Sequence, residues 1–365
     1  MARVLFSGYY GSGNTGDEAI LAALLGTVRR LKPALEPVVL SADPAATHAD
    51  HGVAAVPHFS LAALRGELAQ AQLLISGGGS LLQDTTSWRS PLYYLGVIWL
   101  AQRAGLKTAA LCQGLGPLRR GWLRRLTARL FCRLDLIALR DQESADFLVG
   151  LGLPAAKVQL TADAVWLLDP APMEQIDQLL QAKGLLSLPR PLVGVFLRPL
   201  PDYPPTAPLW GALAAGLDQA LARLGGSALF IPMQPPGDAA TAQQVMAQMR
   251  APAHLLTGRY SPAELLGLTG TLDLIVGMRL HGLIFAAQQA VPAAGLPYDP
   301  KVAAFLAQAG LPNLPLTAPE PAAFAEILAQ LWQARDSHVI RLTGLRDERR
   351  QAALQAVTAA LNLLK

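Results

Sequence analysis

The stretch GYYGSGNTGDEAIL, residues 8–21, decides how the N-terminal part of the chain is interpreted. In it, Gly11, Gly13 and Gly16 form a G-x-G-x-x-G pattern between an apolar run and an apolar helical pattern. This is the setting of a dinucleotide-binding turn, in which a pyrophosphate lies on a helix N-terminus. The pattern alone is weak evidence, so the residues around it decide its meaning.

Two carboxylates follow the glycines and argue against a dinucleotide cofactor. Asp17 and Glu18 fall on the first helical turn, where they favour the helix dipole but would repel a pyrophosphate. Asp43, the candidate for a ribose contact, lies well beyond the usual spacing of about 20 residues. The glycines can instead make a tight turn that Asp17 helps to cap, or Asn14 and Asp17 can face a sugar or an anion.

The composition is that of a globular protein with more than one domain. The chain has 365 residues, which is long for one core, and its 52% hydrophobic residues exclude a disordered protein. A net charge of +4 is too small to indicate nucleic-acid binding. Cys112 and Cys132 form no C-x-x-C pair, and neither a signal peptide nor a membrane span is apparent. We therefore expect a cytoplasmic protein without disulfides or structural zinc.

Short apolar runs alternate with helical patterns along the chain, which is typical of doubly wound parallel sheets. The alternation loosens near residues 169–190 and then restarts. We therefore expect a GT-B-like α/β fold with two Rossmann-like domains and a site in the interdomain cleft. The expected domains span residues 1–170 and 190–346, and a C-terminal helix is expected over residues 347–365.

Candidate ligand-binding groups occur where apolar runs end, which is where open α/β sheets bind ligands. The loop SGGGS, residues 76–80, contains Gly78 and Gly79, which can form an anion nest or simply a tight turn. Asp84 lies just beyond this loop and suits a cap or a sugar contact better than a catalytic acid. Arg140 and Arg198 each end an apolar run, so each guanidinium can clamp a carboxylate or phosphate. Alternatively, Asp141 or Glu143 could pair with Arg140.

The segment MRLHG, residues 278–282, is the most informative. In an extended segment Arg279 and His281 would point the same way, so that the guanidinium holds an anion while the imidazole moves a proton. Gly282 would open the helix that follows. Lys301 is expected on a cleft loop, where its ammonium group can neutralise phosphate charge.

Eight short blocks occur in order between about residues 4 and 302, namely GYYGSGNTGDEAIL, SGGGSLLQD, CQGLGPL, LRDQES, TADAV, VFLRP, MRLHG and YDPKV. In this order they resemble the polysaccharide pyruvyl transferase family, most closely its bacterial S-layer cell-wall polymer members. The resemblance implies an enzyme that transfers a pyruvyl group from phosphoenolpyruvate to a sugar, forming a 4,6-ketal and releasing phosphate. The implied acceptor is a terminal N-acetylmannosamine of a lipid-linked secondary cell-wall polysaccharide, made for S-layer anchoring during cell-wall biogenesis.

The resemblance also suggests roles for the candidate residues. The expected catalytic residues are His281 and Arg279. The expected donor-binding residues are Arg140, Arg198, Arg279, Lys301 and Gly282. The expected acceptor-side or loop residues are Gly13, Asn14, Asp17, Gly78, Gly79 and Asp84. No metal and no separate cofactor are expected, since phosphoenolpyruvate is the donor substrate.

The segment RRGWLRRLTARLFCRLD, residues 119–135, interleaves six arginines with apolar side chains. It predicts either a core-packed helix with a solvated arginine face, or a peripheral contact with an anionic membrane through residues 119–133. In the second case the protein would work at the inner face of the cytoplasmic membrane. No nucleic-acid partner is expected.

Two other functions fit part of the pattern. A GT-B nucleotide-sugar glycosyltransferase would share the architecture but needs a base-binding pocket, for which no clear candidate is present. A non-catalytic module for anionic glycans is disfavoured by the joint presence of Arg279, His281 and Lys301. The proline-rich stretch PLPDYPPTAPLW, residues 199–210, departs from the family pattern and leaves the acceptor open.

Overall fold

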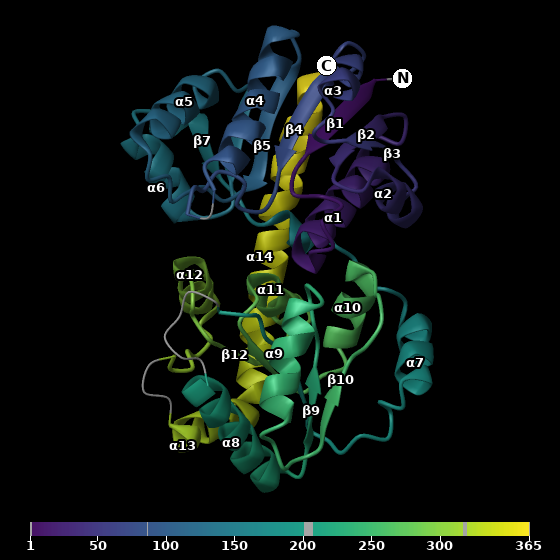
Figure 1. Ribbon diagram of the computed structural model, residues 1–365, viewed down its shortest axis with the longest axis vertical. Coiled ribbons are helices and arrows are strands. Elements are labelled where there is room, and N and C mark those ends of the chain that lie inside the picture. Colours follow the sequence, from purple (N-terminus) through teal and green to yellow (C-terminus); the bar gives the residue numbers. More distant parts are fainter. Residues whose placement is uncertain (1, 86, 201–206, 317–319, 365) are drawn as a thin grey trace. The chain divides into compact units, whose positions relative to one another are not determined.

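The computed structural model describes residues 2–85, 87–200, 207–316 and 320–364. The chain forms two compact units (Figure 1). The first unit comprises residues 1–168 together with 348–365, and the second comprises residues 169–347. Residues 201–206, in the proline-rich stretch noted above, lie outside the described residues.

The first unit is built on a parallel sheet with the strand order β3-β2-β1-β4-β5-β6-β7. Its strands are β1 Arg3–Ser7, β2 Glu36–Ser41, β3 Ala54–Pro57, β4 Leu73–Gly77, β5 Lys107–Gln113, β6 Leu136–Leu139 and β7 Val158–Leu160. Central strand β1 pairs with both β2 and β4, so Phe6 lies opposite Val39 on one side and Ile75 on the other. All three side chains are fully buried, as expected for a parallel sheet covered on both faces.

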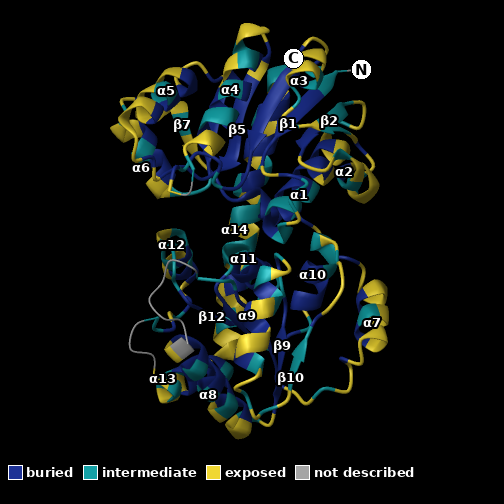
Figure 2. Ribbon diagram, in the orientation of Figure 1, coloured by how far each residue is buried: buried dark blue, intermediate teal, exposed yellow. Residues whose placement is uncertain are grey.

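Helices connect these strands and cover the sheet (Figures 1 and 2). The helices of the first unit are α1 Thr15–Leu31, α2 Pro44–His51, α3 Leu61–Leu68, α4 Arg89–Arg103, α5 Gly121–Phe131 and α6 Gln142–Gly150, with short 3₁₀ turns at Ala155–Lys157, Ala164–Leu167 and Asn362–Leu364. The long helix α14, Arg335–Leu361, supplies residues to both units. The sequence placed the start of this helix near residue 347, which is wrong by about three turns. From Glu348 onward the helix belongs to the first unit.

The second unit repeats the arrangement with the strand order β10-β9-β8-β11-β12, again all parallel. Its strands are β8 Leu192–Phe196, β9 Ser227–Phe230, β10 Ala253–Leu255, β11 Leu274–Gly277 and β12 Ala293–Gly295. Its helices are α7 Met173–Ala182, α8 Ala207–Leu224, α9 Gly237–Met246, α10 Pro262–Thr269, α11 Leu280–Gln288, α12 Pro300–Ala309 and α13 Pro321–Gln333. The prediction of two doubly wound parallel sheets is confirmed.

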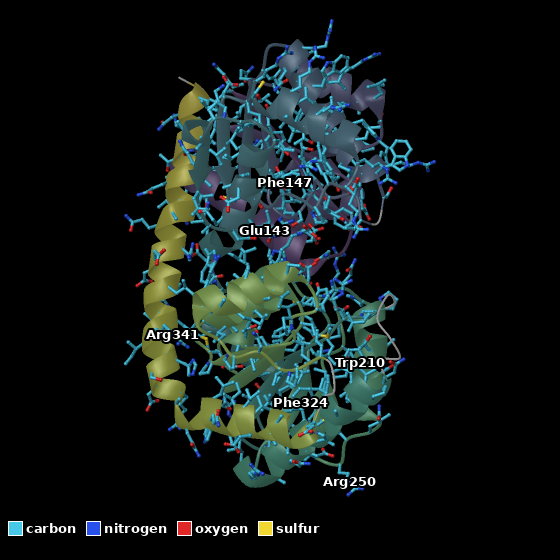
Figure 3. The ribbon with its side chains drawn as sticks, turned by 90° about the vertical axis from the view of Figure 1, so that its left-hand side faces the viewer. Glu143, Phe147, Trp210, Arg250, Phe324 and Arg341 are labelled. Atoms are coloured by element: carbon cyan, nitrogen blue, oxygen red, sulfur yellow. The ribbon has the colours of Figure 1, made fainter. Side chains whose placement is uncertain are left out.

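Helices α8 and α13 form one side of the core of the second unit. Trp210 on α8 and Phe324 on α13 are both buried in it (Figure 3). A Cβ at Gly216 would lie 2.6 Å from the Cβ of Phe324, so the two helices approach closely only because this residue is glycine.

Each sheet has one point where the strand order reverses. In the first unit this point lies between β1 and β4, and in the second it lies between β8 and β11. Loops that leave such neighbouring strands diverge to opposite faces, and they open a crevice that binds ligands. The loops after β1, β4, β8 and β11 are therefore the places to look for a site. Within the described residues, every helix is too short or too polar to cross a bilayer.

Candidate functional site

The opening glycine loop connects β1 to α1 at the switch point of the first unit. Its helix is capped by Asn14, whose side chain accepts the N–H of Gly16 at 3.0 Å. The carboxylate of Glu18 accepts the N–H of Gly11 at 2.8 Å, and Gly11 has a positive φ of 73°. The N-cap residue is Asn14, and Asp17 lies in the first turn of α1, where its charge favours the helix dipole.

The second glycine loop follows β4 and packs directly on α1. Gly78 and Gly79 have positive φ values of 69° and 64°. A Cβ on Gly78 would lie 2.1 Å from Ile20, and one on Gly79 would lie 2.8 Å from the carboxylate of Asp17. Asp17 therefore lies against this loop, which disfavours a phosphate there and supports the interpretation that the G-x-G-x-x-G pattern is not a dinucleotide site.

Asp84 anchors the segment that precedes α5. Its buried carboxylate accepts the N–H groups of Arg119 at 2.7 Å and Arg120 at 3.0 Å, and the guanidinium of Arg120 lies 3.3 Å away. Burial disfavours the charged carboxylate, but these hydrogen bonds outweigh burial and hold the pKa of Asp84 below its ordinary value. Of the two interpretations considered for Asp84, the geometry favours the cap.

Replacing Asp84 with Asn should destabilise the first unit, because the N–H groups of Arg119 and Arg120 lose a charged acceptor. We expect a loss of about 1–3 kcal/mol near neutral pH, measured by chemical denaturation. Since the folded pKa is depressed, the stability due to Asp84 is present above the ordinary carboxyl pKa of about 3.9 and is lost as pH falls through the folded pKa. The difference between the two proteins should therefore shrink below about pH 4, and a difference that is constant with pH would contradict this.

Arg140 lies at the end of β6 in a buried ion-pair network. Its Nη1 lies 2.5 Å from the carboxylate of Asp163, its Nη2 donates to the hydroxyl of Ser80 at 3.1 Å, and its Nε lies 3.5 Å from Asp141. Its side chain is only 7% exposed. Asp141 was anticipated from the sequence, whereas Asp163, which follows β7, was not. In this network Arg140 ties the glycine loop after β4 to the ends of β6 and β7.

Arg198 lies directly after β8, on one side of the switch point of the second unit. Its Nη1 donates to the hydroxyl of Tyr298 at 2.8 Å, and its Nε donates to the carbonyl of Pro199 at 3.2 Å. The guanidinium carbon lies 4.7 Å from the centre of the Tyr298 ring, which adds a cation–π contact. Because Tyr298 follows β12, the Arg198 side chain reaches across the end of β11.

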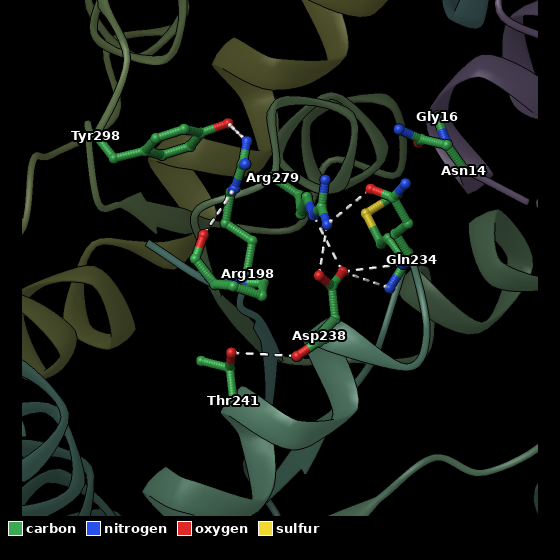
Figure 4. A network of polar contacts seen from close by, with 11 residues as sticks. Asn14, Gly16, Arg198, Gln234, Asp238, Thr241, Arg279 and Tyr298 are labelled. Carbon is green, nitrogen blue, oxygen red and sulfur yellow. Dashed lines mark hydrogen bonds and ion pairs between the residues drawn. The ribbon is translucent and has the colours of Figure 1, made fainter. Parts of the chain in front are cut away.

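Arg279 follows β11 and reaches in the opposite direction (Figure 4). Its guanidinium forms a two-point ion pair with Asp238, whose side chain is 1% exposed, and also donates to Gln234 at 3.2 Å. Asp238 additionally accepts the N–H groups of Met233 and Gln234. Gln234 belongs to the connection between β9 and α9, and Asp238 lies in the first turn of α9, so Arg279 reaches across the end of β8.

The two arginines therefore cross over the switch point of the second unit. No protein acceptor within the described residues takes a hydrogen bond from Nη2 of Arg198 or from Nη1 of Arg279. Arg279 is also the residue that precedes α11, and its side chain does not cap that helix. Guanidinium donors beside an uncapped helix N-terminus make a site suited to phosphate or carboxylate.

His281 and Gly282 lie on α11 and not before it. The helix begins at Leu280, so Arg279 and His281 do not share an extended segment, and the expectation that they point the same way for that reason is wrong. His281 instead lies in the first turn and is partly exposed. A Cβ on Gly282 would lie 2.8 Å from the ring of Phe196, so this glycine lets the start of α11 pack on the end of β8.

Lys301 was expected on a loop, but α12 begins at Pro300 and places Lys301 in its first turn. Asp299 caps this helix and accepts the N–H of Lys301 at 2.9 Å. The proline starts the helix because its fixed φ suits the first turn and its missing N–H is not needed there. A contact between Lys301 and a donor phosphate stays a prediction.

Solved structures with a similar fold include two proteins bound to nucleotide sugars and a glycosyltransferase. HepE from Anabaena in complex with UDP-glucose has 14% sequence identity and a TM-score of 0.62, over 100% of this chain and 98% of that one. UDP-GlcNAc 2-epimerase from Neisseria meningitidis, bound to UDP-GlcNAc, has 13% identity and a TM-score of 0.63, over 100% and 99%. A glycosyltransferase from Rickettsia africae has 10% identity and a TM-score of 0.58, over 100% and 95%. At these identities the similarity establishes the fold, which is GT-B-like.

The sequence comparison identifies the family within this fold. The profile of the polysaccharide pyruvyl transferase family matches residues 14–300, so the chain belongs to that family and is a transferase. The match includes the glycine loop after β4, Arg140, Arg198 and the MRLHG segment, and it begins at Asn14, just after Gly11 and Gly13 of the opening loop. A search of curated proteins finds no match to the sequence.

Proposed function

We propose that the protein transfers the pyruvyl group of phosphoenolpyruvate to two hydroxyl groups of a sugar, forming a ketal and releasing phosphate. Membership of the polysaccharide pyruvyl transferase family supports this reaction class. We further propose a terminal N-acetylmannosamine of a lipid-linked secondary cell-wall polysaccharide as the acceptor and a 4,6-ketal as the product. This finer assignment rests on the resemblance of the sequence blocks to the S-layer cell-wall members of the family.

One observation supports the donor site more than any other: Arg198 and Arg279 cross over the switch point of the second unit beside the start of α11. Phosphoenolpyruvate carries a carboxylate and a phosphate, which both accept hydrogen bonds from guanidinium groups and helix N-termini. Because Asp238 already neutralises part of the charge of Arg279, Lys301 is proposed to supply further positive charge. Gly282 contributes the close packing of α11 on β8, which holds this helix start in place.

The reaction needs a group that both gives and takes a proton. Carbon C3 of the enol must gain a proton, which leaves C2 electron-poor. The first sugar hydroxyl loses its proton as its oxygen bonds to C2. The second hydroxyl then forms the other C–O bond while the C2–O bond to phosphate breaks, and the proton of this second hydroxyl leaves with the phosphate. We assign the proton transfers to His281, because an imidazole exchanges protons near neutral pH and this one lies on the first turn of α11.

The first unit is proposed to bind the acceptor with the loops at its own switch point. Gly13, Asn14 and Asp17 lie on the loop and first turn after β1, and Gly78 and Gly79 follow β4. Asp17 is the best candidate for a sugar hydroxyl, since carboxylates accept hydrogen bonds from hydroxyl groups. Arg140 and Asp84 are reassigned to holding these loops in place, because their charged groups are already engaged by the protein.

The decisive experiment measures phosphate release from phosphoenolpyruvate by the purified protein, with and without a soluble or lipid-linked ManNAc-GlcNAc acceptor. Acceptor-dependent release, with a product mass that corresponds to one added pyruvyl ketal, is the expected result. Binding of phosphoenolpyruvate without release for any acceptor would leave the donor site standing and remove the proposed acceptor. Neither binding nor release would overturn the proposal.

The second candidate function is a nucleotide-sugar glycosyltransferase, which the fold of the UDP-sugar-bound structures favours. If the protein has this function, UDP-glucose or UDP-GlcNAc should bind to it more tightly than phosphoenolpyruvate does. Calorimetric titration of the same protein with all three compounds separates the two functions.

Arg198 offers a test of donor recognition alone. Replacing Arg198 with Lys removes the two-point fork and the planar stacking on Tyr298 but keeps one positive charge. We expect the KM for phosphoenolpyruvate to rise about 10- to 100-fold with a smaller change in kcat, measured by phosphate release. Tyr298→Phe keeps the stacked ring and loses only one hydrogen bond, so its effect should be smaller; a larger effect would place Tyr298 itself on the substrate.

A further inference from the structure

Positive charge is concentrated in one part of the first unit. The fifty residues between Asp84 and Asp135 contain nine basic residues and no acidic one. Because the whole chain has a net charge of only +4, the rest of the chain is net acidic. This segment forms α4, β5 and α5, and five of the nine basic residues lie on α4 and α5, two neighbouring helices that pack against each other (Figure 1).

The exposed face of α4 adds aromatic side chains to this charge. Trp88 precedes the helix and Trp99 lies three turns along the same face; they are 39% and 45% exposed. Each carries an arginine over its ring, Arg89 at 5.8 Å from the ring centre of Trp88 and Arg103 at 5.2 Å from that of Trp99. Tryptophan beside arginine is the combination found where proteins contact the polar–apolar boundary of a membrane.

Helix α5 continues the same face. Trp122 is 45% exposed, and its ring packs edge-on against Trp88 with the centres 6.0 Å apart. The opposite side of α5 is buried in the core through residues such as Leu123 and Leu130, which leaves Arg125 and Arg129 exposed (Figure 2). The helix is therefore both core-packed and basic on its outer side, so the two interpretations considered for this segment are compatible.

An apolar cavity of about 400 Å³ opens beside these tryptophans. Leu92 and Tyr93 line it from α4 and Trp88 from just before this helix, while Phe59 lines it from the connection between β3 and α3 and Leu61 from the start of α3. The ring of Phe59 is 80% exposed, which is costly in water unless something covers it.

We propose that the exposed faces of α4 and α5, together with this cavity, form a surface that binds an anionic phospholipid bilayer. We call it the α4–α5 surface. The arginines contact lipid phosphates, the tryptophans lie at the headgroup level, and Phe59 and the cavity take up acyl-chain carbon. Nucleic acid fits less well because it offers nothing for the apolar cavity. A second copy also fits less well, because a symmetric contact would bring the two basic faces together.

The test is co-sedimentation of the full chain with phosphatidylcholine vesicles that contain or lack phosphatidylglycerol. The protein should bind only the anionic vesicles, and raised salt should weaken binding because it screens the arginines. Arg125→Glu/Arg129→Glu should weaken binding roughly 30-fold or more, because each basic residue near such a membrane contributes about a fivefold change and the variant also adds two negative charges. Phe59→Ser should weaken it to a lesser extent.

Matched controls are available outside the α4–α5 surface. Arg250→Glu/Arg335→Glu removes the same number of exposed positive charges, and Ile340→Ser changes a side chain that is 76% exposed. Neither control should affect vesicle binding, and thermal unfolding checks that every variant is folded. The salt titration uses the unaltered protein, so its result does not depend on whether any variant folds.

The inference would be overturned if the protein does not bind anionic vesicles, or if it binds neutral vesicles equally well. It would also be overturned if the control variants lose as much vesicle binding as Arg125→Glu/Arg129→Glu. A dimer that depends on Phe59 and does not bind vesicles would also overturn it and identify a second copy as the occupant. The inference does not depend on the reaction proposed above, since phosphate release with a soluble acceptor should be unchanged in Arg125→Glu/Arg129→Glu.

Discussion

His281→Gln should lower the rate of phosphate release about 10²- to 10⁴-fold, while phosphoenolpyruvate still binds with near-normal affinity. The reason is that a glutamine keeps the size and polarity of the side chain but cannot gain and lose a proton near neutral pH. Rates come from single-turnover phosphate release, and affinity comes from calorimetric titration with phosphoenolpyruvate. His281→Ala should give the same loss, because both variants lack the proton-transfer group.

The pair Arg279→Lys and His281→Gln distinguishes binding from proton transfer. Arg279→Lys disturbs the ion pair with Asp238 and the donor contact together, so its effect should appear in donor affinity as well as in rate. Near-normal turnover in His281→Gln would refute the proton-transfer role. A loss of donor affinity equal to the loss of rate would make His281 a binding residue instead.

The second large effect concerns stability. Arg140→Met should destabilise the first unit by about 3–5 kcal/mol in chemical denaturation, because it leaves the buried carboxylate of Asp163 without its guanidinium. Arg140→Met/Asp163→Leu should lose less than the single variant, since no buried charge is left unpaired. Asp347→Ala breaks the exposed pair with Arg346 and should cost no more than about 1 kcal/mol.

If the double variant is as unstable as Arg140→Met, the unpaired charge on Asp163 does not account for the loss, and the lost hydrogen bonds from Arg140 to Ser80 and from the N–H of Val165 to Asp163 become the explanation. If Arg140→Met unfolds at the same denaturant concentration as the unaltered protein, the network does not support the first unit. A variant that remains folded but loses donor binding would return Arg140 to the donor site that the sequence suggested.

The alternation of apolar runs and helical patterns predicted both parallel sheets because the central strands are buried on two faces and most helices on one. Residues 4–6 and 73–75 show this directly, since they are apolar without alternation and lie in neighbouring central strands. The order of strands within each sheet does not follow from such a pattern. The strand order depends on the face of the sheet that each connecting helix crosses. Packing between segments that are distant in the sequence decides that face.

The candidate arginines could be found from the sequence because each ends an apolar run. The acidic residues that pair with them could not be found in this way. Asp238 and Asp163 come from other strand–helix connections, and nothing in local spacing pairs them with Arg279 or Arg140. A signal was present for Asp238: it follows Pro-Pro-Gly at the start of a helix, a place where a carboxylate commonly caps. For His281, the prediction was wrong about where the helix begins. Leu280, the first residue of α11, is equally compatible with the end of a strand.

The first unit is made from two pieces of chain with the whole of the second unit between them. Its last piece is held by contacts such as the hydroxyl of Thr161 donating to the carbonyl of Ala352 at 2.9 Å, and by fully buried residues such as Val357. A ribosome adds about 5–20 residues per second, so residues 2–168 wait roughly 10 to 40 seconds for Glu348 and the residues after it. The second unit is one continuous stretch and has no such delay. During synthesis the nascent second unit can therefore reach its native state before the earlier-made unit does, and chaperones would have to protect the N-terminal sheet in the interval.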